Sequence, residues 1–328
     1  MQDQENQIEV EKKGKQFAWF LLAFALGLGL RLWRLGEMSF TLAEAQLAES
    51  TWQMALGQFV RLPGNMSYTG LSAVLFHLFE PSFFFARLIP AIAGSSLTLL
   101  PWFWRDTIRE KTALVLAFGL AFDPILLSFS RLIVTPILAV AGAAWAVTAA
   151  KNRRPVLAGS LLAVGWLGGY SFWVIAICCA ALLAWRKRQN AEPSNCDFRA
   201  KAFWLPFVTS FIISLALIST AFLLYTPGLG GVGAGFVEFI QLFGSSYQLP
   251  IYQPIITTVA YSILPLTFMI WGIIEDLVQK RAPKNLPAFI GWGLSVILCV
   301  LLGRRDLGLL VMAVFCAWIG AADQIATI

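Results

Sequence analysis

Long apolar runs are the feature of this sequence that most restricts its fold. Runs of roughly 16 to 20 apolar residues recur along the chain, and about 20 apolar residues in a helix cross the hydrocarbon core of a bilayer. Only 13% of the residues are charged, whereas a soluble domain carries about 25%. No stretch is long and polar enough to form a separate water-soluble domain. The sequence therefore predicts an all-α, polytopic integral membrane protein.

The apolar runs divide the chain into a short polar tail and one transmembrane domain, at residues 1–16 and 17–328. The run that starts at Phe17 has no Ala-x-Ala-like cleavage site after it, so we interpret it as a retained helix and not as a signal peptide. We expect about ten spans, at residues 17–33, 87–104, 112–127, 135–150, 155–169, 171–185, 203–225, 255–275, 287–302 and 307–322.

The basic residues predict the orientation of these spans in a cell (plasma or inner) membrane. Seventeen of the 24 Lys and Arg residues fall in five pieces that alternate with the spans, namely residues 1–16, 105–111, 151–154, 186–201 and 276–286. Positively charged loops stay in the cytoplasm, so we place these pieces and the N-terminus there. Membrane orientation then explains the net charge of +6, and we expect no nucleic-acid partner.

This orientation predicts two large loops on the outer side, at residues 34–86 and 226–254. The apolar segment 69–79 is too short to cross the bilayer, so we expect it to form a short helix at the outer interface. The first loop would then carry two short interfacial helices. The other outer connections are too short to build a site, which places the expected function in these two loops.

Metal and cofactor chemistry have no recognisable motif in the sequence. Four of the five cysteines lie inside apolar spans, there is no CxxC pair, and His77 is the single histidine. We interpret His77 as a packed residue. The chain has no P-loop, no dinucleotide-binding glycine motif after a strand, and no Ser/His/Asp set. We therefore expect neither a metal nor a cofactor.

Glu44 is the most informative acidic residue of the first outer loop. In a helix over residues 42–56 its carboxylate faces away from the polar stripe that contains Gln53, so it could act as a general base in a cavity. Thr41-Leu-Ala-Glu44 also fits a capping box, in which Glu44 caps its own helix. The two roles do not exclude one another.

Three further charged residues are candidates for substrate binding, and the two arginines among them for contact with a lipid phosphate. Asp123, followed by Pro124, predicts the end of a helix, and Arg131 could pair with Asp123 or bind an anionic headgroup. Arg87 opens a predicted span, where a side chain either extends to the interface or contacts a phosphate. For both arginines, plain interfacial anchoring is the alternative.

Several short motifs, in order along the chain, resemble the family 39-type GT-C membrane glycosyltransferases, which include protein O-mannosyltransferases and aminoarabinose transferases. They are Arg31-Leu-Trp-Arg34-Leu35, Ala43-Glu44-Ala45, Tyr68-Thr-Gly70, residues 86–94 (ARLIPAIAG), Phe122-Asp-Pro124 with Ser130-Arg131, and more faintly Thr226-Pro-Gly-Leu229 and Gln253-Pro254. The resemblance implies transfer of a sugar from a polyprenyl-phosphate carrier on the outer membrane face. It also implies that an acidic residue of the first outer loop is the base and that cationic residues hold the lipid phosphate.

The chain departs from the family pattern at three charged positions. The family usually has Asp-Glu where this chain has Ala43-Glu44, an Asp where it has Thr135 or Pro136, and a Lys near Gly169. General base catalysis contributes about 10²–10⁴-fold, so loss of the usual Asp matters unless Glu44 substitutes for it. The departures favour either an altered transferase or a member that keeps the fold without the reaction.

Three functions follow from these observations. The first is a GT-C-like transferase with Glu44 as base, Arg87, Arg131 and Asp123 at the substrate, and membrane lipids and a polyprenyl-phosphate-linked sugar as partners. The second is a non-catalytic scaffold or accessory subunit bound to other membrane proteins. A transporter is the third, with less support because the spans lack paired intramembrane charges and a clear inverted repeat.

Overall fold

The computed structural model of the chain describes residues 2–59, 64–105, 107–133, 136–188, 201–243, 250–281, 283–302 and 307–327. All regular elements in these ranges are helices. The first eight elements are α1 (Gln2–Leu32), α2 (Leu42–Ala55), α3 (Met66–Leu78), α4 (Phe83–Ser96), η1 (Leu97–Leu99), α5 (Leu100–Trp104), α6 (Glu110–Phe122) and α7 (Pro124–Phe129). They are followed by α8 (Ile137–Lys151), α9 (Pro155–Trp166), α10 (Tyr170–Arg188), α11 (Lys201–Ser219), η2 (Thr226–Gly233), α12 (Ala234–Leu242), α13 (Tyr252–Tyr261), α14 (Ile263–Val278), α15 (Leu286–Leu301), η3 (Leu307–Leu309) and α16 (Leu310–Thr327).

Within the residues that the structure describes, two continuous helical stretches are long and apolar enough to cross a membrane, Phe83–Trp104 and Leu307–Thr327. They coincide with the spans expected at 87–104 and 307–322. The pair α13 and α14 makes a third when the two are counted as one bent span. Shorter apolar helices of 10–17 residues occupy six further stretches, among them Gln16–Leu32 and Phe203–Ser219.

The span expected at 255–275 is not one straight helix. Its two halves, α13 and α14, meet at Ser262 with an angle of 84° between them. Pro265 explains the position of the break, because it has no N–H to donate to the carbonyl of Tyr261 and its ring crowds that carbonyl. The helix that begins at Tyr252 therefore ends at Tyr261.

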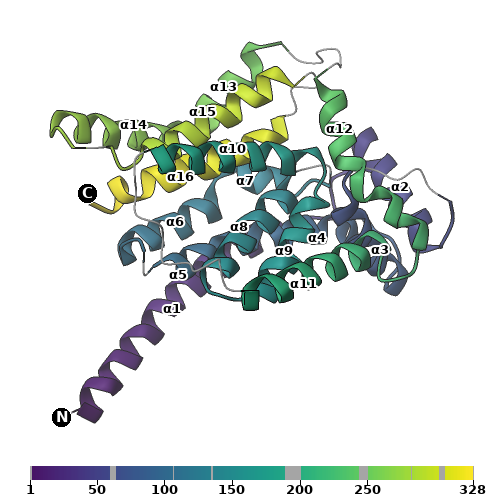
Figure 1. The fold of residues 1–328 in the computed structure, drawn as a ribbon, viewed down its shortest axis with the longest axis horizontal. Coiled ribbons are helices and arrows are strands. Elements are labelled where there is room, and N and C mark those ends of the chain that lie inside the picture. Colours follow the sequence, from purple (N-terminus) through teal and green to yellow (C-terminus); the bar gives the residue numbers. More distant parts are fainter. Residues whose placement is uncertain are drawn as a thin grey trace.

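The short apolar segment at 69–79 forms most of helix α3. With 13 residues it is shorter than a membrane span. It packs against α2, α4 and α11 (Figure 1), and more than half of its residues are buried, including the polar Ser67, Thr69 and Ser72. The short helix that the sequence predicts is therefore present, and it packs within the protein.

The two loops that the sequence places on one side of the membrane also lie at one end of the molecule. Helices α2, α3 and α12 gather there, away from the N-terminal part of α1 (Figure 1). The backbone of η2 approaches α3 so closely that a Cβ on Gly231 would lie 2.8 Å from the sulfur of Met66. The predicted position of residues 34–86 and 226–254 on the same side of the membrane requires that the two loops lie at the same end of the molecule.

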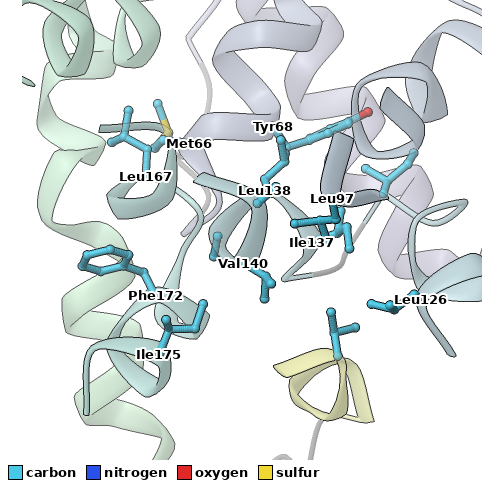
Figure 2. Close-up of a cluster of buried hydrophobic side chains, with 14 of the residues drawn as sticks. Met66, Tyr68, Leu97, Leu126, Ile137, Leu138, Val140, Leu167, Phe172 and Ile175 are labelled. Carbon is cyan, nitrogen blue, oxygen red and sulfur yellow. The ribbon is translucent and has the colours of Figure 1, made fainter. Parts of the chain in front are cut away.

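The interior is a continuous cluster of apolar side chains that surrounds α8. Figure 2 shows Ile137, Leu138 and Val140 of this helix, with Met66 of α3 and Phe172 of α10 on one side of them and Leu126 of α7 on the other. Five consecutive residues of α8, from Ile137 to Ala141, are buried. The first turns of α8 are buried and its exposed Val147 is apolar, so the helix has no polar face, which explains why its sequence has no amphipathic pattern.

Gly70 allows α3 to pack closely against α11, and we predict that Gly70→Ala destabilises the fold. A Cβ at this position would lie 1.8 Å from the carbonyl oxygen of Ile218, so the two helices must separate. Overpacking of this kind costs about 1–3 kcal/mol. Thermal unfolding in detergent should show a lower Tm than that of the wild type.

Gly29→Ala is the matched control for this prediction, because a Cβ on Gly29 in α1 meets nothing within 4 Å. This variant should keep the Tm of the wild type. Equal Tm values for both variants would contradict the close contact between α3 and α11.

Candidate functional site

Glu44 lies in the first turn of α2, where it closes a capping box. The backbone N–H of Glu44 donates to Thr41 Oγ1 over 3.3 Å, and the backbone N–H of Thr41 donates to Glu44 Oε2 over 3.0 Å. This reciprocal pair satisfies N–H groups that a helix start leaves without partners. The capping interpretation drawn from Thr41-Leu-Ala-Glu44 is confirmed.

The same carboxylate forms a buried ion pair with Arg87 of α4. Arg87 Nη2 lies 3.1 Å from Glu44 Oε2, and Arg87 Nε lies 3.4 Å from Glu44 Oε1. Both residues are only 2% exposed. A two-point contact of this kind suits the planar guanidinium, and burial of both charges is tolerated because each charge finds a partner.

The rest of the Arg87 guanidinium binds the connection between α1 and α2. Its Nη1 donates to the carbonyl oxygens of Leu35 and Met38, over 3.3 and 2.6 Å, and its Nη2 donates to that of Ser39 over 3.1 Å. The ring of Phe40 lies 5.0 Å from the guanidinium carbon. Arg87, expected at a lipid phosphate or at the interface, is thus buried and surrounded by groups of this chain.

Glu44 also holds the segment that follows α7. The backbone N–H of Ile133 donates to Glu44 Oε1 over 3.2 Å, and Thr41 Oγ1 adds a contact of 3.3 Å to Oε2. Burial opposes ionisation of this carboxyl, but the hydrogen bonds from Thr41, Arg87 and Ile133 outweigh it and hold the pKa of Glu44 below its ordinary value. An ionised, fully bonded carboxylate is a weak proton acceptor.

Asp123 stands at the break between α6 and α7, as the sequence Asp123-Pro124 predicted. Its Oδ1 accepts hydrogen bonds from the backbone N–H groups of Ile125 and Leu126, over 2.9 and 3.0 Å, and so caps α7. Its Oδ2 accepts a hydrogen bond of 2.8 Å from the indole of Trp318 in α16. These partners account for the buried carboxylate, and none of them is Arg131.

Arg31 is a buried cation whose role the sequence did not reveal. It is fully buried near the end of α1, and its Nε donates to Ser130 Oγ over 2.9 Å. Its other nitrogens bind the carbonyl oxygens of Gly27, Ala121 and Leu120, at 2.9, 3.3 and 3.2 Å. Arg31 thereby satisfies carbonyls at the end of α6, where Pro124 prevents the helix from continuing. Its position at the end of an apolar run suggested only a flanking charge.

Arg131 borders an open pocket of about 460 Å³ between the end of α1 and the segment after α7. The pocket is lined by Trp33, Arg34, Glu37, Met38 and Arg131. Arg131 Nη2 donates to the carbonyl oxygen of Trp33 over 2.7 Å, whereas its buried Nε has no hydrogen-bond partner. Arg34 and Glu37 form an exposed ion pair at the same pocket. The pocket thus combines the charged side chain of Arg131 with the apolar side chains of Trp33 and Met38.

The four residues proposed from the sequence fall into three separate environments. Glu44 and Arg87 form one buried pair, Asp123 caps α7, and Arg131 borders the pocket. Glu44 does not line this pocket. Glu44 is connected to the pocket through Ile133, which lies two residues after Arg131 and donates its backbone N–H to the carboxylate of Glu44. The pair therefore fixes the backbone next to the pocket without facing it.

The described helices form an all-α bundle typical of a polytopic membrane protein, in which helices of the two predicted outer loops lie at one end. No protein-family model and no curated protein matches the sequence. Among solved structures, the chain is similar to ArnT from Cupriavidus metallidurans bound to undecaprenyl phosphate, with a TM-score of 0.67 and 14% identity. The match covers 95% of this chain and 60% of the ArnT chain. The GT-C resemblance indicated by the sequence motifs is confirmed for the fold.

We predict that the Glu44–Arg87 pair behaves as one structural unit. Arg87→Met leaves a buried carboxylate without its cation, which costs about 3–5 kcal/mol. The double variant Glu44→Gln with Arg87→Met removes both charges and should lose less free energy of unfolding than Arg87→Met alone. Denaturant unfolding in detergent measures this coupling.

The control for this comparison of single and double variants is the exposed pair Arg34–Glu37. Its removal should change the free energy of unfolding by at most about 1 kcal/mol. Purely additive effects of the Glu44 and Arg87 substitutions would contradict the predicted coupling.

Proposed function

We propose that this protein binds a polyprenyl-phosphate-linked sugar at the outer face of a cell membrane, with its N-terminus in the cytoplasm, and transfers the sugar to an acceptor. The observation that carries the proposal is the pocket that Arg131 lines together with the apolar side chains of Trp33 and Met38. A guanidinium presents donors in a plane that fits two phosphate oxygens. The structural similarity to ArnT, a protein solved with undecaprenyl phosphate, supports the same class of ligand.

The apolar part of the pocket suits the lipid end of such a ligand. Trp33 and Met38 line the pocket and are 71% and 58% exposed. Exposed side chains of this size contact acyl or prenyl chains when they lie at the membrane surface. A charged donor and an apolar wall in one pocket favour an amphiphile whose phosphate binds Arg131 and whose chain extends along Trp33.

Glu44 is the residue that we assign as base in the transfer step. The acceptor hydroxyl would attack the anomeric carbon of the sugar, and the bond from that carbon to the phosphate oxygen would break. The bonding electrons leave with the polyprenyl phosphate, and the hydroxyl proton passes to the carboxylate of Glu44. Because Glu44 accepts hydrogen bonds from Thr41, Arg87 and Ile133 and does not line the pocket, the step requires it to release one of these partners and to become accessible to the acceptor.

A second candidate function is that of a non-catalytic membrane subunit that binds the carrier or other membrane proteins. The saturated and buried carboxylate of Glu44 favours this alternative, because all of its contacts are accounted for by the fold. Ala43, at the position where the resembling family has Asp, favours it as well. In this case Glu44 contributes stability and no chemistry.

We predict that Arg131→Gln weakens binding of undecaprenyl phosphate about 10- to 100-fold, because a charge-assisted hydrogen bond contributes about 1.5–3 kcal/mol. Binding is measured on the purified protein in lipid nanodiscs. Arg109→Gln, at an exposed arginine before α6, is the control and should bind as the wild type does. Unchanged binding by Arg131→Gln would contradict the proposed site.

The transfer step is tested in the same preparation with Glu44→Gln. This variant should abolish sugar transfer while it retains binding of undecaprenyl phosphate. Thr41→Ala removes the cap of α2 but keeps the carboxylate, so it is the control for lost stability and should remain active. Absence of transfer in the wild type, together with intact lipid binding, would favour the non-catalytic subunit.

A further inference from the structure

The turn at residues 151–154, between α8 and α9, is a strongly cationic surface at the end of the molecule that the sequence places in the cytoplasm. Three of its four residues are basic and none is acidic. The side chains of Lys151, Arg153 and Arg154 are all exposed. Lys151 Nζ also donates a hydrogen bond to Thr107 Oγ1 in the connection before α6. Residues 105–111 of that connection include three basic and two acidic residues, so the combined surface remains positive.

The backbone of this turn is fixed, and Arg153 occupies a position where glycine is usual. The N–H of Arg153 donates to the carbonyl oxygen of Ala150 over 3.0 Å, and that of Arg154 donates to the carbonyl oxygen of Ala149 over 2.9 Å. These bonds form a Schellman motif, in which Arg153 is left-handed with a φ of 53°. A Cβ disfavours this conformation, so arginine destabilises the turn relative to glycine. Orientation in a membrane requires cations in this loop but not at this position, which indicates a binding role for the guanidinium.

Exposed apolar side chains lie within one helical turn of these cations. Val147 of α8, four residues before Lys151, is 61% exposed. Val156 and Leu157, in the first turn of α9, are 54% and 47% exposed. A surface that combines cations with apolar side chains suits an amphiphile, whose headgroup contacts the cations and whose acyl chains contact the valine and leucine side chains.

We propose that Lys151, Arg153 and Arg154 bind the headgroup of an anionic phospholipid in the cytoplasmic leaflet. A guanidinium presents its donors in a plane that fits two phosphate oxygens, and basic residues next to a membrane span are attracted to anionic lipids. The inference is independent of the proposed sugar transfer, because it concerns residues on the opposite side of the membrane from the pocket at Arg131.

The test titrates the detergent-solubilised protein with dioleoyl phosphatidylglycerol or dioleoyl phosphatidylcholine and measures bound lipid by native mass spectrometry. The wild type should bind phosphatidylglycerol at least about tenfold more tightly. Each cation near an anionic headgroup contributes about fivefold in affinity. Arg153→Gly should therefore weaken phosphatidylglycerol binding about fivefold, and Arg153→Gly combined with Arg154→Gln should weaken it about 25-fold.

Arg153→Gly also separates lipid binding from a structural role of the charge. Glycine adopts the left-handed conformation without strain, so the Tm of this variant without added lipid should be at least that of the wild type. A cation can instead stabilise the C-terminus of α8 through the helix dipole. That role predicts a lower Tm and unchanged lipid affinity in Arg153→Gly, and this result would overturn the proposal.

Lys280→Gly is the matched control. Lys280 follows α14 in the same conformation, with a φ of 54°, and its N–H and that of Arg281 form the same pair of backbone hydrogen bonds. Glu275 and Asp276 near the end of α14 offset the two cations there. Lys280→Gly should therefore keep the affinity for phosphatidylglycerol. Equal affinity of the wild type for the two lipids, or equal losses in Arg153→Gly and Lys280→Gly, would overturn the proposed site.

Inorganic phosphate separates a lipid headgroup from free phosphate at the same cations. It lacks the acyl chains that contact Val156 and Leu157, so it should displace phosphatidylglycerol only at concentrations at least about 100-fold higher than those of the lipid. Displacement at equal concentration would assign the surface to free phosphate and would overturn lipid binding.

Discussion

The ion pair between Glu44 and Arg87 is the interaction on which the end of the molecule with α2 and α3 depends. It joins the start of α2 to α4, and through further hydrogen bonds it holds the α1–α2 connection and the segment after α7. Two buried charges are costly to desolvate. The hydrogen bonds that the guanidinium of Arg87 and the carboxylate of Glu44 form with the surrounding chain offset this cost. Three segments distant in sequence meet at this pair, namely residues 35–44, α4 and the segment after α7, so its loss would remove the contacts that hold them together.

A second buried arginine organises the neighbouring part of the fold. Arg31 binds carbonyl oxygens at the end of α6 and the hydroxyl of Ser130, while Asp123 caps α7 and accepts from Trp318. The two residues compensate for the backbone groups that the Pro124 break leaves without helical partners. The chain after α7 is then held at Ser130 and at Ile133, so Arg131 between them has a fixed position beside the pocket.

Local features of the sequence predicted local structure well. Thr41-Leu-Ala-Glu44 indicated the capping box, Asp123-Pro124 indicated the end of α6, and the shortness of the apolar segment at 69–79 indicated that α3 does not span the bilayer. The GT-C motifs indicated the fold, which the similarity to ArnT confirms. In each case the signal lies within a few residues or in the order of motifs along the chain.

Long-range partners could not be read in the same way. Arg87 meets a carboxylate 43 positions away and Arg31 a hydroxyl 99 positions away, and helical periodicity gives the face of a helix but not its neighbour. The sequence therefore left Arg87 either at the membrane interface or at a lipid phosphate, and Arg31 as a flanking charge. The bend between α13 and α14 was missed for a different reason, since Pro265 lies inside an otherwise uniform apolar run.

The most direct test of this account is an experimental structure of the protein in a lipid nanodisc with undecaprenyl phosphate added. The account predicts phosphate density in contact with Arg131, in the pocket lined by Trp33 and Met38, with Arg87 still bound by the connection between α1 and α2. Phosphate density on Arg87, with that connection displaced, would contradict it.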